Sequence, residues 1–297
     1  MSDRAKGNTA LLLTALVWGS GFVAQRLGNE ILPPMSFNSI RQIMAGLVLL
    51  PVLAVSLRSS GYLSREKASI AQISFRRRKA LIGGLVCGVF MLSGSMLQQI
   101  GLVTLSAGKS GFISSIYIVF VPIFSVILGN HIKRRSVFCV VMAMAGFGVM
   151  SLQGGLGSVT AGDWLTLLSA ASFAAQIVAV NNFLDRNNDI LLSVIQMFFC
   201  GIVGFAIAFF VEHPQLGAVI EGLPLLLYMT FFPTAAGFTL QIIGQKYTDS
   251  SSAALIMSLE SVFALIFGML FLHEMMSLRE AIGAMIIFAA TLIGQRE

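Results

Sequence analysis

Ten long apolar runs most strongly limit what this chain can fold into. Each is close to the roughly 20 residues that a helix needs to cross a hydrocarbon core of about 30 Å. Hydrophobic residues make up 56% of the 297 positions and charged residues only 11%. Because only a helix satisfies its own backbone polar groups in lipid, each run must be helical. We expect an all-α integral membrane protein whose ten transmembrane helices lie near 8–27, 35–57, 80–103, 108–129, 136–153, 163–184, 190–211, 223–246, 250–272 and 277–295.

The stretch 94–124 occurs a second time in the chain. A shift of 143 positions places it on 237–267, and 11 of the 31 positions are then identical. The matches include paired glycines and the pair Gln98 and Gln241, which chance does not readily supply at fixed spacing. A weaker match at a shift of 155 relates the first two spans to the sixth and seventh and places Trp18 on Phe173. These shifts predict an internal duplication.

The duplication divides the chain into two five-helix repeats, 1–153 and 163–297, joined by a linker at 154–162 that begins in a Gly-rich segment. Since five is odd, the second repeat enters the membrane upside down relative to the first. Two inverted halves can present a central site to one side and then to the other. This arrangement predicts alternating access.

Basic residues predict the orientation. Fifteen Lys and Arg residues fall on the side that holds both termini and three fall on the opposite side, with Arg41 left inside a span. The positive-inside rule therefore places both termini in the cytoplasm. The cluster Arg76–Lys79 is either a topology anchor just before the third span or a patch for anionic lipid or nucleic acid.

Two charged residues inside spans are candidates for substrate binding or coupling. Arg41 lies one to two turns into the second span, where it either snorkels outward or meets an acid or an anionic ligand. Glu260 lies near the middle of the ninth span, where it either exchanges a proton during transport or stays charged and holds an internal partner or a substrate amine. A permanent structural pair is the alternative for Glu260.

Four uncharged residues complete the set of candidates. Trp18 lies among small residues in the first span and either lines a cavity or packs in the bundle. Gln98 and Gln241 occupy matching positions of the two repeats, and we expect both to face the central cavity, with bonding between helices as the alternative. Tyr117 is the counterpart of Glu260 in the first repeat.

Other function classes find little support in the sequence. The three cysteines fall inside predicted helices, so neither a disulfide framework nor a metal site follows, and no cofactor is expected. The three histidines lie at span ends, and the chain has no GxxxxGK[ST] or HExxH motif, which argues against an enzyme. A channel or a non-transporting membrane factor remains the alternative. Either a monomer or a homodimer is compatible with the pattern.

Several motifs together resemble those of the EamA-like branch of the drug/metabolite transporter superfamily. They are small-Trp-Gly-Ser in the first span, Pro followed by Arg41 in the second, Ser-Ala-Gly-Lys-Ser-Gly before the fourth, and Phe-Leu-His-Glu274 closing the ninth. The resemblance covers nearly the whole chain. It implies two EamA repeats in the cell membrane and transport of small metabolites, often outward. The first repeat departs from the family pattern, because it has His131 where the second has Glu274.

Overall fold

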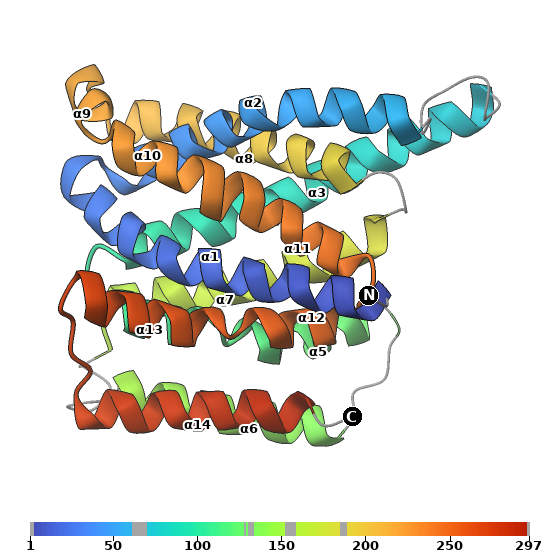
Figure 1. Ribbon diagram of the computed structural model, residues 1–297. Coiled ribbons are helices and arrows are strands. Elements are labelled where there is room, and N and C mark those ends of the chain that lie inside the picture. Colours follow the sequence, from blue (N-terminus) through green and yellow to red (C-terminus); the bar gives the residue numbers. More distant parts are fainter. Residues whose placement is uncertain are drawn as a thin grey trace.

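The computed structural model describes residues 3–60, 70–127, 129, 134–151, 159–184 and 189–295, and within these ranges every regular element is a helix (Figure 1). His131, most of the expected linker, and the basic residues Arg65, Lys67, Lys133, Arg186 and Arg296 lie outside the described residues. The helices are α1 (Asp3–Ile31), α2 (Pro34–Ser60), α3 (Ile70–Gly101), α4 (Ala107–Ser114), α5 (Tyr117–Ile127), α6 (Arg134–Ser151), α7 (Ala161–Phe183), α8 (Asp189–Val211), α9 (Leu216–Glu221), α10 (Leu223–Met229), the π-helix η2 (Thr230–Gly237), α11 (Phe238–Gln245), α12 (Ser250–Met257), α13 (Glu260–Phe271) and α14 (Leu278–Gln295).

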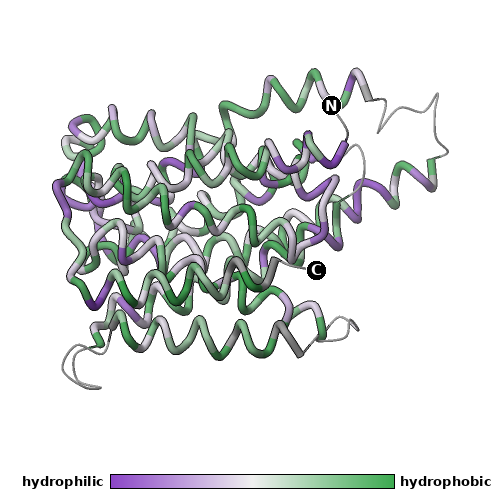
Figure 2. The backbone as a smooth tube through the Cα atoms, turned by 60° about the horizontal axis from the view of Figure 1, so that its bottom comes forward, coloured by the Kyte–Doolittle hydropathy of each residue, from purple (hydrophilic) through white to green (hydrophobic). Residues whose placement is uncertain are grey.

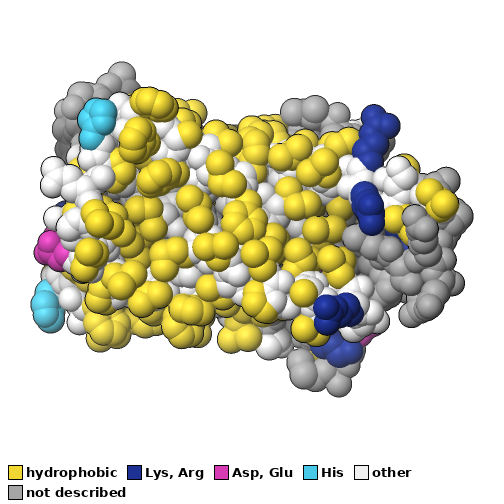
Figure 3. Space-filling model, turned by 90° about the horizontal axis from the view of Figure 1, so that it is seen from above, with side chains coloured by type: hydrophobic (Ala, Val, Ile, Leu, Met, Phe, Trp, Pro, Cys, Tyr) yellow, Lys and Arg dark blue, Asp and Glu magenta, His cyan; other side chains and the backbone are white. Residues whose placement is uncertain are grey.

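Eight segments of the described chain are long and apolar enough to cross a membrane, as judged by length and composition. They match eight of the ten expected spans, and some are built from consecutive shorter helices, such as α10, η2 and α11. Helices α6 and α14 lie where the fifth and tenth spans are expected. The surface carries a broad apolar belt, with charged and histidine side chains near its two ends (Figure 3).

The helices run side by side, and both chain ends lie at one end of the bundle (Figure 1). We call this the terminal end and the opposite one the distal end. Helix α2 packs along α8, and α3 packs along α7 and α8. Helix α1 contacts α11 and α13, whereas α6 and α14 pair with each other in a layer at the edge (Figure 1). The first turns of α3 project beyond the bundle at the terminal end, and there hydrophilic residues are interspersed with hydrophobic ones (Figure 2).

A break in the helix occurs twice, 143 residues apart. Helix α4 ends at Ser114 and α5 begins at Tyr117, while α12 ends at Met257 and α13 begins at Glu260. The caps recur as well, because Ser106 accepts a hydrogen bond from the third residue of α4 and Asp249 does the same for α12. Glu260 therefore begins a helix, although the sequence suggested an uninterrupted span.

Paired glycines allow paired aromatic rings to pack closely. A Cβ atom on Gly237 would lie 2.5 Å from the indole nitrogen of Trp18, and one on Gly94 would lie 3.0 Å from the Phe173 ring. Gly94 and Gly237 differ by the shift of 143, and Trp18 and Phe173 differ by the shift of 155. Gly94 and Gly237 are therefore positions where a ring from a distant helix lies against the backbone.

Candidate functional site

One cavity lies between helices from both parts of the chain, with about 520 Å³ of space free of protein atoms, mouth included. Its wall is formed by side chains of α1, α2, α3, α5, α7, η2, α11 and α13. The lining residues are Trp18, Phe22, Gln25, Arg41, Ser95, Gln98, Tyr117, Phe173, Gln176, Ile177, Pro233, Phe238 and Glu260. Five of the six candidates from the sequence are among them, and Gln241 is not.

Trp18 is positioned by an irregular helix. The π-helix η2 contains Pro233, which lacks a backbone N–H, and the Trp18 indole donates a 2.9 Å hydrogen bond to the Pro233 carbonyl. The Trp18 ring also packs against Phe238, with ring centroids 4.9 Å apart. Trp18 thus presents a fixed aromatic face to the cavity.

Arg41 is held by neutral oxygens. Its guanidinium donates to Asn38 Oδ1 at 2.8 Å, Thr234 Oγ1 at 3.2 Å and Gln25 Oε1 at 3.4 Å. The side chain is 3% exposed, its Nε makes no hydrogen bond, and no carboxylate among the described residues pairs with it. Arg41 is therefore buried with one donor unused and its charge unpaired, so snorkelling to the surface does not describe its position.

Glu260 and Tyr117 are the first residues after the two matching breaks, and they meet at the cavity. Glu260 is 4% exposed and Tyr117 is 1% exposed. The Tyr117 hydroxyl lies beside the Glu260 carboxylate without the geometry of a regular hydrogen bond. No Lys or Arg within the described chain forms an ion pair with Glu260. Lys109 pairs with Asp163.

The two matching glutamines have different surroundings. Gln98 lies on the cavity wall and donates to Ser114 Oγ at 2.9 Å. Gln241 lies behind the wall, fully buried, and donates to Gln176 Oε1 at 2.9 Å. Gln176, which does line the cavity, donates in turn to Gln196 at 3.1 Å. Gln241 is therefore connected to the cavity through the side-chain amide of Gln176.

Sequence reasoning missed several polar lining residues, among them Gln25, Ser95 and Gln176. A signal for two of them was present, because Gln25 and Gln176 are amides inside apolar runs, the property that drew attention to Gln98. Ser95 offers no such signal, since serine is common wherever membrane helices pack closely. Its hydroxyl accepts a 3.0 Å hydrogen bond from Asn38, which itself holds Arg41.

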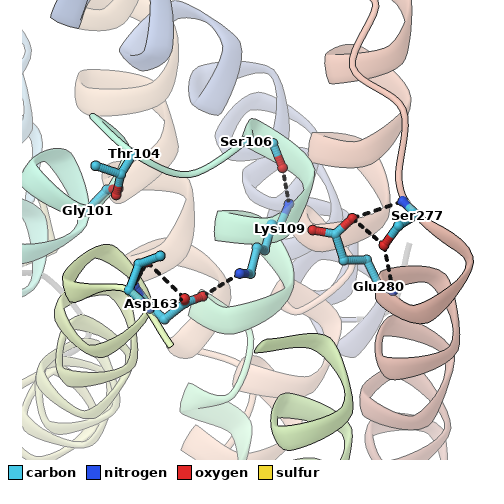
Figure 4. Close-up of polar contacts among 8 residues, drawn as sticks. Gly101, Thr104, Ser106, Lys109, Asp163, Ser277 and Glu280 are labelled. Atoms are coloured by element: carbon cyan, nitrogen blue, oxygen red, sulfur yellow. Dashed lines mark hydrogen bonds and ion pairs between the residues drawn. The ribbon is translucent and has the colours of Figure 1, made fainter. Parts of the chain in front are cut away.

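At the distal end, charged groups join α4 to α7 and α13. Lys109 of α4 pairs with Asp163 of α7 at 2.7 Å (Figure 4). Glu274, which follows α13, accepts a 2.8 Å hydrogen bond from the Ala107 amide. Burial raises the pKa of the Glu274 carboxyl above its usual range, although the Ala107 and Gly108 amides and Arg26 act in the opposite direction.

Comparison with known proteins gives a consistent result. The model of the EamA-like transporter family matches residues 5–152 and again residues 160–293. An uncharacterized transporter of Archaeoglobus fulgidus is 30% identical over 292 residues, which is 98% of this chain and 86% of that protein. The uncharacterized transporter YvbV of Bacillus subtilis is 26% identical over 97% of this chain and 91% of its own length. A solved crystal structure shares the fold with a TM-score of 0.68 at 16% identity, covering 98% of this chain and 96% of that one.

Proposed function

Because the chain belongs to the EamA-like transporter family, we propose that it is a secondary active transporter that moves a small amino-acid-like or drug-like metabolite by alternating access. It is a multi-pass protein of the cell membrane. In the proposed arrangement ten spans form two inverted five-helix repeats, 1–153 and 163–297, joined by a linker at 154–162. Both termini face the cytoplasm and transport runs outward.

Several recurrences support the inverted repeats. The family model matches twice, and at a shift of 143 α4 has the same bounds as α12 and α5 begins where α13 begins. A hydrogen-bond pattern also recurs near opposite ends of the bundle. Gln99 donates to a carbonyl of α1 and to Asn29 four residues further on, while Gln245 donates to a carbonyl of α7 and to Asn181 four residues further on. The two patterns are alike in type but lie out of register with the repeat, because the shifts of 143 and 155 place Gln99 on Ile242 and Gln25 on Val180. The support for the inverted repeats therefore comes from the double family match and the broken helices.

Charge supports the proposed orientation. Lys and Arg side chains gather toward one end of the apolar belt, and His and acidic side chains lie at the other (Figure 3). The basic start of α3, with Arg77 and Arg78 exposed, projects at the terminal end (Figure 2). Since cytoplasmic segments carry the excess of Lys and Arg, the terminal end is assigned to the cytoplasm.

One observation carries the substrate proposal: Arg41 and Glu260 line the same cavity, and neither has an ion-pair partner among the residues that the structure describes. A buried charge is costly unless an opposite charge satisfies it. A small molecule with an anionic group at Arg41 and a cationic group at Glu260 would satisfy both. The aromatic rings of Trp18 and Phe173 would contact its apolar part.

Glu260 also supports proton coupling. A carboxylate at membrane depth without a cation beside it is a group that can carry a proton when no substrate occupies the cavity. In this scheme substrate and proton compete for Glu260, so that the gradient of one drives the other. No enzymatic step is part of the proposal.

The test is reconstitution of the purified chain in liposomes. We expect saturable counterflow of a zwitterionic amino acid or analogue, with a toxicity screen of overexpressing cells used to choose the compound. Liposomes with the Arg41→Ala/Glu260→Gln double variant are the control for leakage. Fast ionic currents without exchange would indicate a channel, and flux that does not saturate or show counterflow would contradict the carrier mechanism.

A further inference from the structure

A buried ion pair joins the two halves of the chain at the distal end. Lys109 Nζ lies 2.7 Å from Asp163 Oδ1, with the Lys109 side chain 11% exposed and the Asp163 side chain 0% exposed (Figure 4). Asp163 is fixed in place, because its other oxygen accepts hydrogen bonds from the backbone and hydroxyl of Thr160 in a capping box. The pair therefore connects the start of α4 with the start of α7.

A second carboxylate from the later half of the chain holds the same helix. Glu274 Oε2 accepts the Ala107 amide, the first of α4, at 2.8 Å. The side chain of Ser106 accepts the Lys109 amide, so two side chains share the exposed N–H groups of this helix end. Helix α4 thus contacts both Asp163 and Glu274.

The matching place at the terminal end lacks the ion pair. The shift of 143 places Ser252 where α4 has Lys109, and the shift of 155 places Asn8 where α7 has Asp163. Helix α12 is capped by its own neighbour Asp249. A second ion pair, Lys246–Asp189 at 3.0 Å, joins α11 to α8, which both belong to the later half. Among the described residues, a buried ion pair between the halves is therefore found at the distal end alone.

We propose that Lys109, Asp163 and Glu274 form a gate that holds the distal end closed, and that the cavity opens at this end when their contacts with α4 break. The inference rests on the proposed alternating-access function and names the residues that control one of its two openings. Helix α4 is suited to this role, because its last residue, Ser114, bonds Gln98 on the cavity wall and α5 follows with Tyr117. Release of the start of α4 would thus move the cavity wall.

The gate can be tested by thiol accessibility without any substrate. Ser95→Cys places a nearly isosteric reporter on the cavity wall of a variant in which Cys87, Cys139 and Cys200 are serine. Met275→Cys, at an 82% exposed distal position, shows in a separate sample which side of the liposome the distal end faces. A membrane-impermeant thiol reagent is then added from that side.

We expect Lys109→Met to raise the labelling rate of Ser95→Cys at least about tenfold, because it removes the Lys109 ammonium group that lies 2.7 Å from the buried Asp163 carboxylate. Lys109→Arg keeps the charge and should label close to the parent rate. Lys246→Met is the matched control, since it breaks an ion pair of the same kind within one half. If Lys109→Met does not fold, Glu274→Ala is the variant that tests the gate. It removes the carboxylate that accepts the Ala107 amide and leaves no buried charge unpaired. Its labelling should also be faster than that of the parent.

Two outcomes would overturn the gate: parent-like labelling in a folded Lys109→Met or Glu274→Ala variant, or equal acceleration in Lys246→Met. Failure of the proposed function is distinguishable from either. If the parent protein shows no counterflow but Lys109→Met still accelerates labelling, the transport proposal is contradicted and the gate proposal stands. Counterflow together with unchanged labelling would contradict the gate alone.

Discussion

Arg41 and Glu260 are buried against the same cavity, and neither is the ion-pair partner of the other. Arg41 is surrounded by amide and hydroxyl oxygens, and Glu260 lies beside the Tyr117 hydroxyl. A cavity that keeps a guanidinium group and a carboxyl group apart is suited to a ligand that carries both an anionic and a cationic group. A direct pair between them would have left no strong site for either group.

Substitution of Arg41 tests whether its planar fork binds the substrate. Arg41→Lys keeps the charge but loses the arrangement of donors, and we expect KM for counterflow to rise about tenfold or more, as for loss of a hydrogen bond to a charged group. Arg58→Lys, on an exposed position of the same helix, is the control. Transport unchanged in both Arg41→Lys and Arg41→Ala would show that Arg41 serves only the packing of the helices.

Much of this site was accessible from the sequence for a physical reason. Charges and amides are costly in lipid, so Arg41, Gln98 and Glu260 in apolar runs mark surfaces that face protein or cavity. All three line the cavity, together with Trp18, which lies among small residues, and Tyr117, the counterpart of Glu260. The rotation of each helix about its axis was not accessible. For that reason the sequence did not show that Gln98 lines the cavity and that Gln241 does not.

Contacts between helices that are far apart in the chain could not be predicted from the sequence either. The pair Lys109–Asp163 joins residues 54 positions apart across the expected linker, and Lys109 could equally have been placed beside Glu260. The helix break before Glu260 falls at Ser258 and Leu259, and neither residue is a Pro or Gly that would have indicated it. Its recurrence 143 residues after the break at Ser115 makes it a feature of the repeat.

Replacement of Glu260 by Gln keeps the shape and removes the exchangeable charge. If Glu260 carries the coupling proton, Glu260→Gln should abolish accumulation driven by a pH gradient, since the amide cannot exchange a proton. Counterflow does not require net proton movement, so it should persist, with a raised KM because the amide no longer pairs with the cationic group of the substrate. Tyr117→Phe is a useful comparison, because it removes the neighbouring hydroxyl and leaves the carboxylate. Gradient-driven accumulation that survives in Glu260→Gln with its pH dependence intact would exclude the coupling role.

Cysteine accessibility should distinguish the two glutamines. In a cysteine-free background, Gln98→Cys should react with a hydrophilic thiol reagent from at least one side of the membrane, because Gln98 lies on the cavity wall. Gln241→Cys should react at least about tenfold more slowly, since Gln241 is fully buried behind Gln176. Substrate should protect Gln98→Cys. If neither cysteine reacts, the cavity is not the aqueous site proposed here.

A glycine substitution tests the close contact between α1 and α13. A Cβ atom on Gly19 would overlap Phe263 Cβ and would lie 2.9 Å from the Glu260 carbonyl, so Gly19→Ala must push the two helices apart. We expect a loss of about 1–3 kcal/mol in the free energy of unfolding, typical of overpacking. Gly217→Ala, in α9 with nothing within 4 Å, is the matched control. Equal melting temperatures of the two variants in detergent would contradict the packing.

The pKa of Glu274 predicts the pH dependence of the distal end. Burial raises this pKa above its ordinary value of 4.5. When the distal end opens and water reaches the carboxyl, the pKa should return to that ordinary value. The closed arrangement therefore binds more protons than the open one between these two values, so protonation favours closure and rising pH favours opening within that window. At pH values below 4.5 or above the raised pKa, the equilibrium between the closed and open arrangements should no longer depend on pH.

Labelling of Ser95→Cys from the distal side should thus accelerate as pH rises through the window just above 4.5. Rates are divided by those of exposed Met275→Cys at each pH, because thiolate formation itself depends on pH. Glu274→Gln can still accept the Ala107 amide and should remove the dependence. The charged group that acts on this carboxyl is Arg26 from α1. His273 precedes Glu274 in the chain, so His273→Asn serves as a second control. A normalised rate that falls with rising pH, or one that keeps its slope in Glu274→Gln, would assign the response to another group.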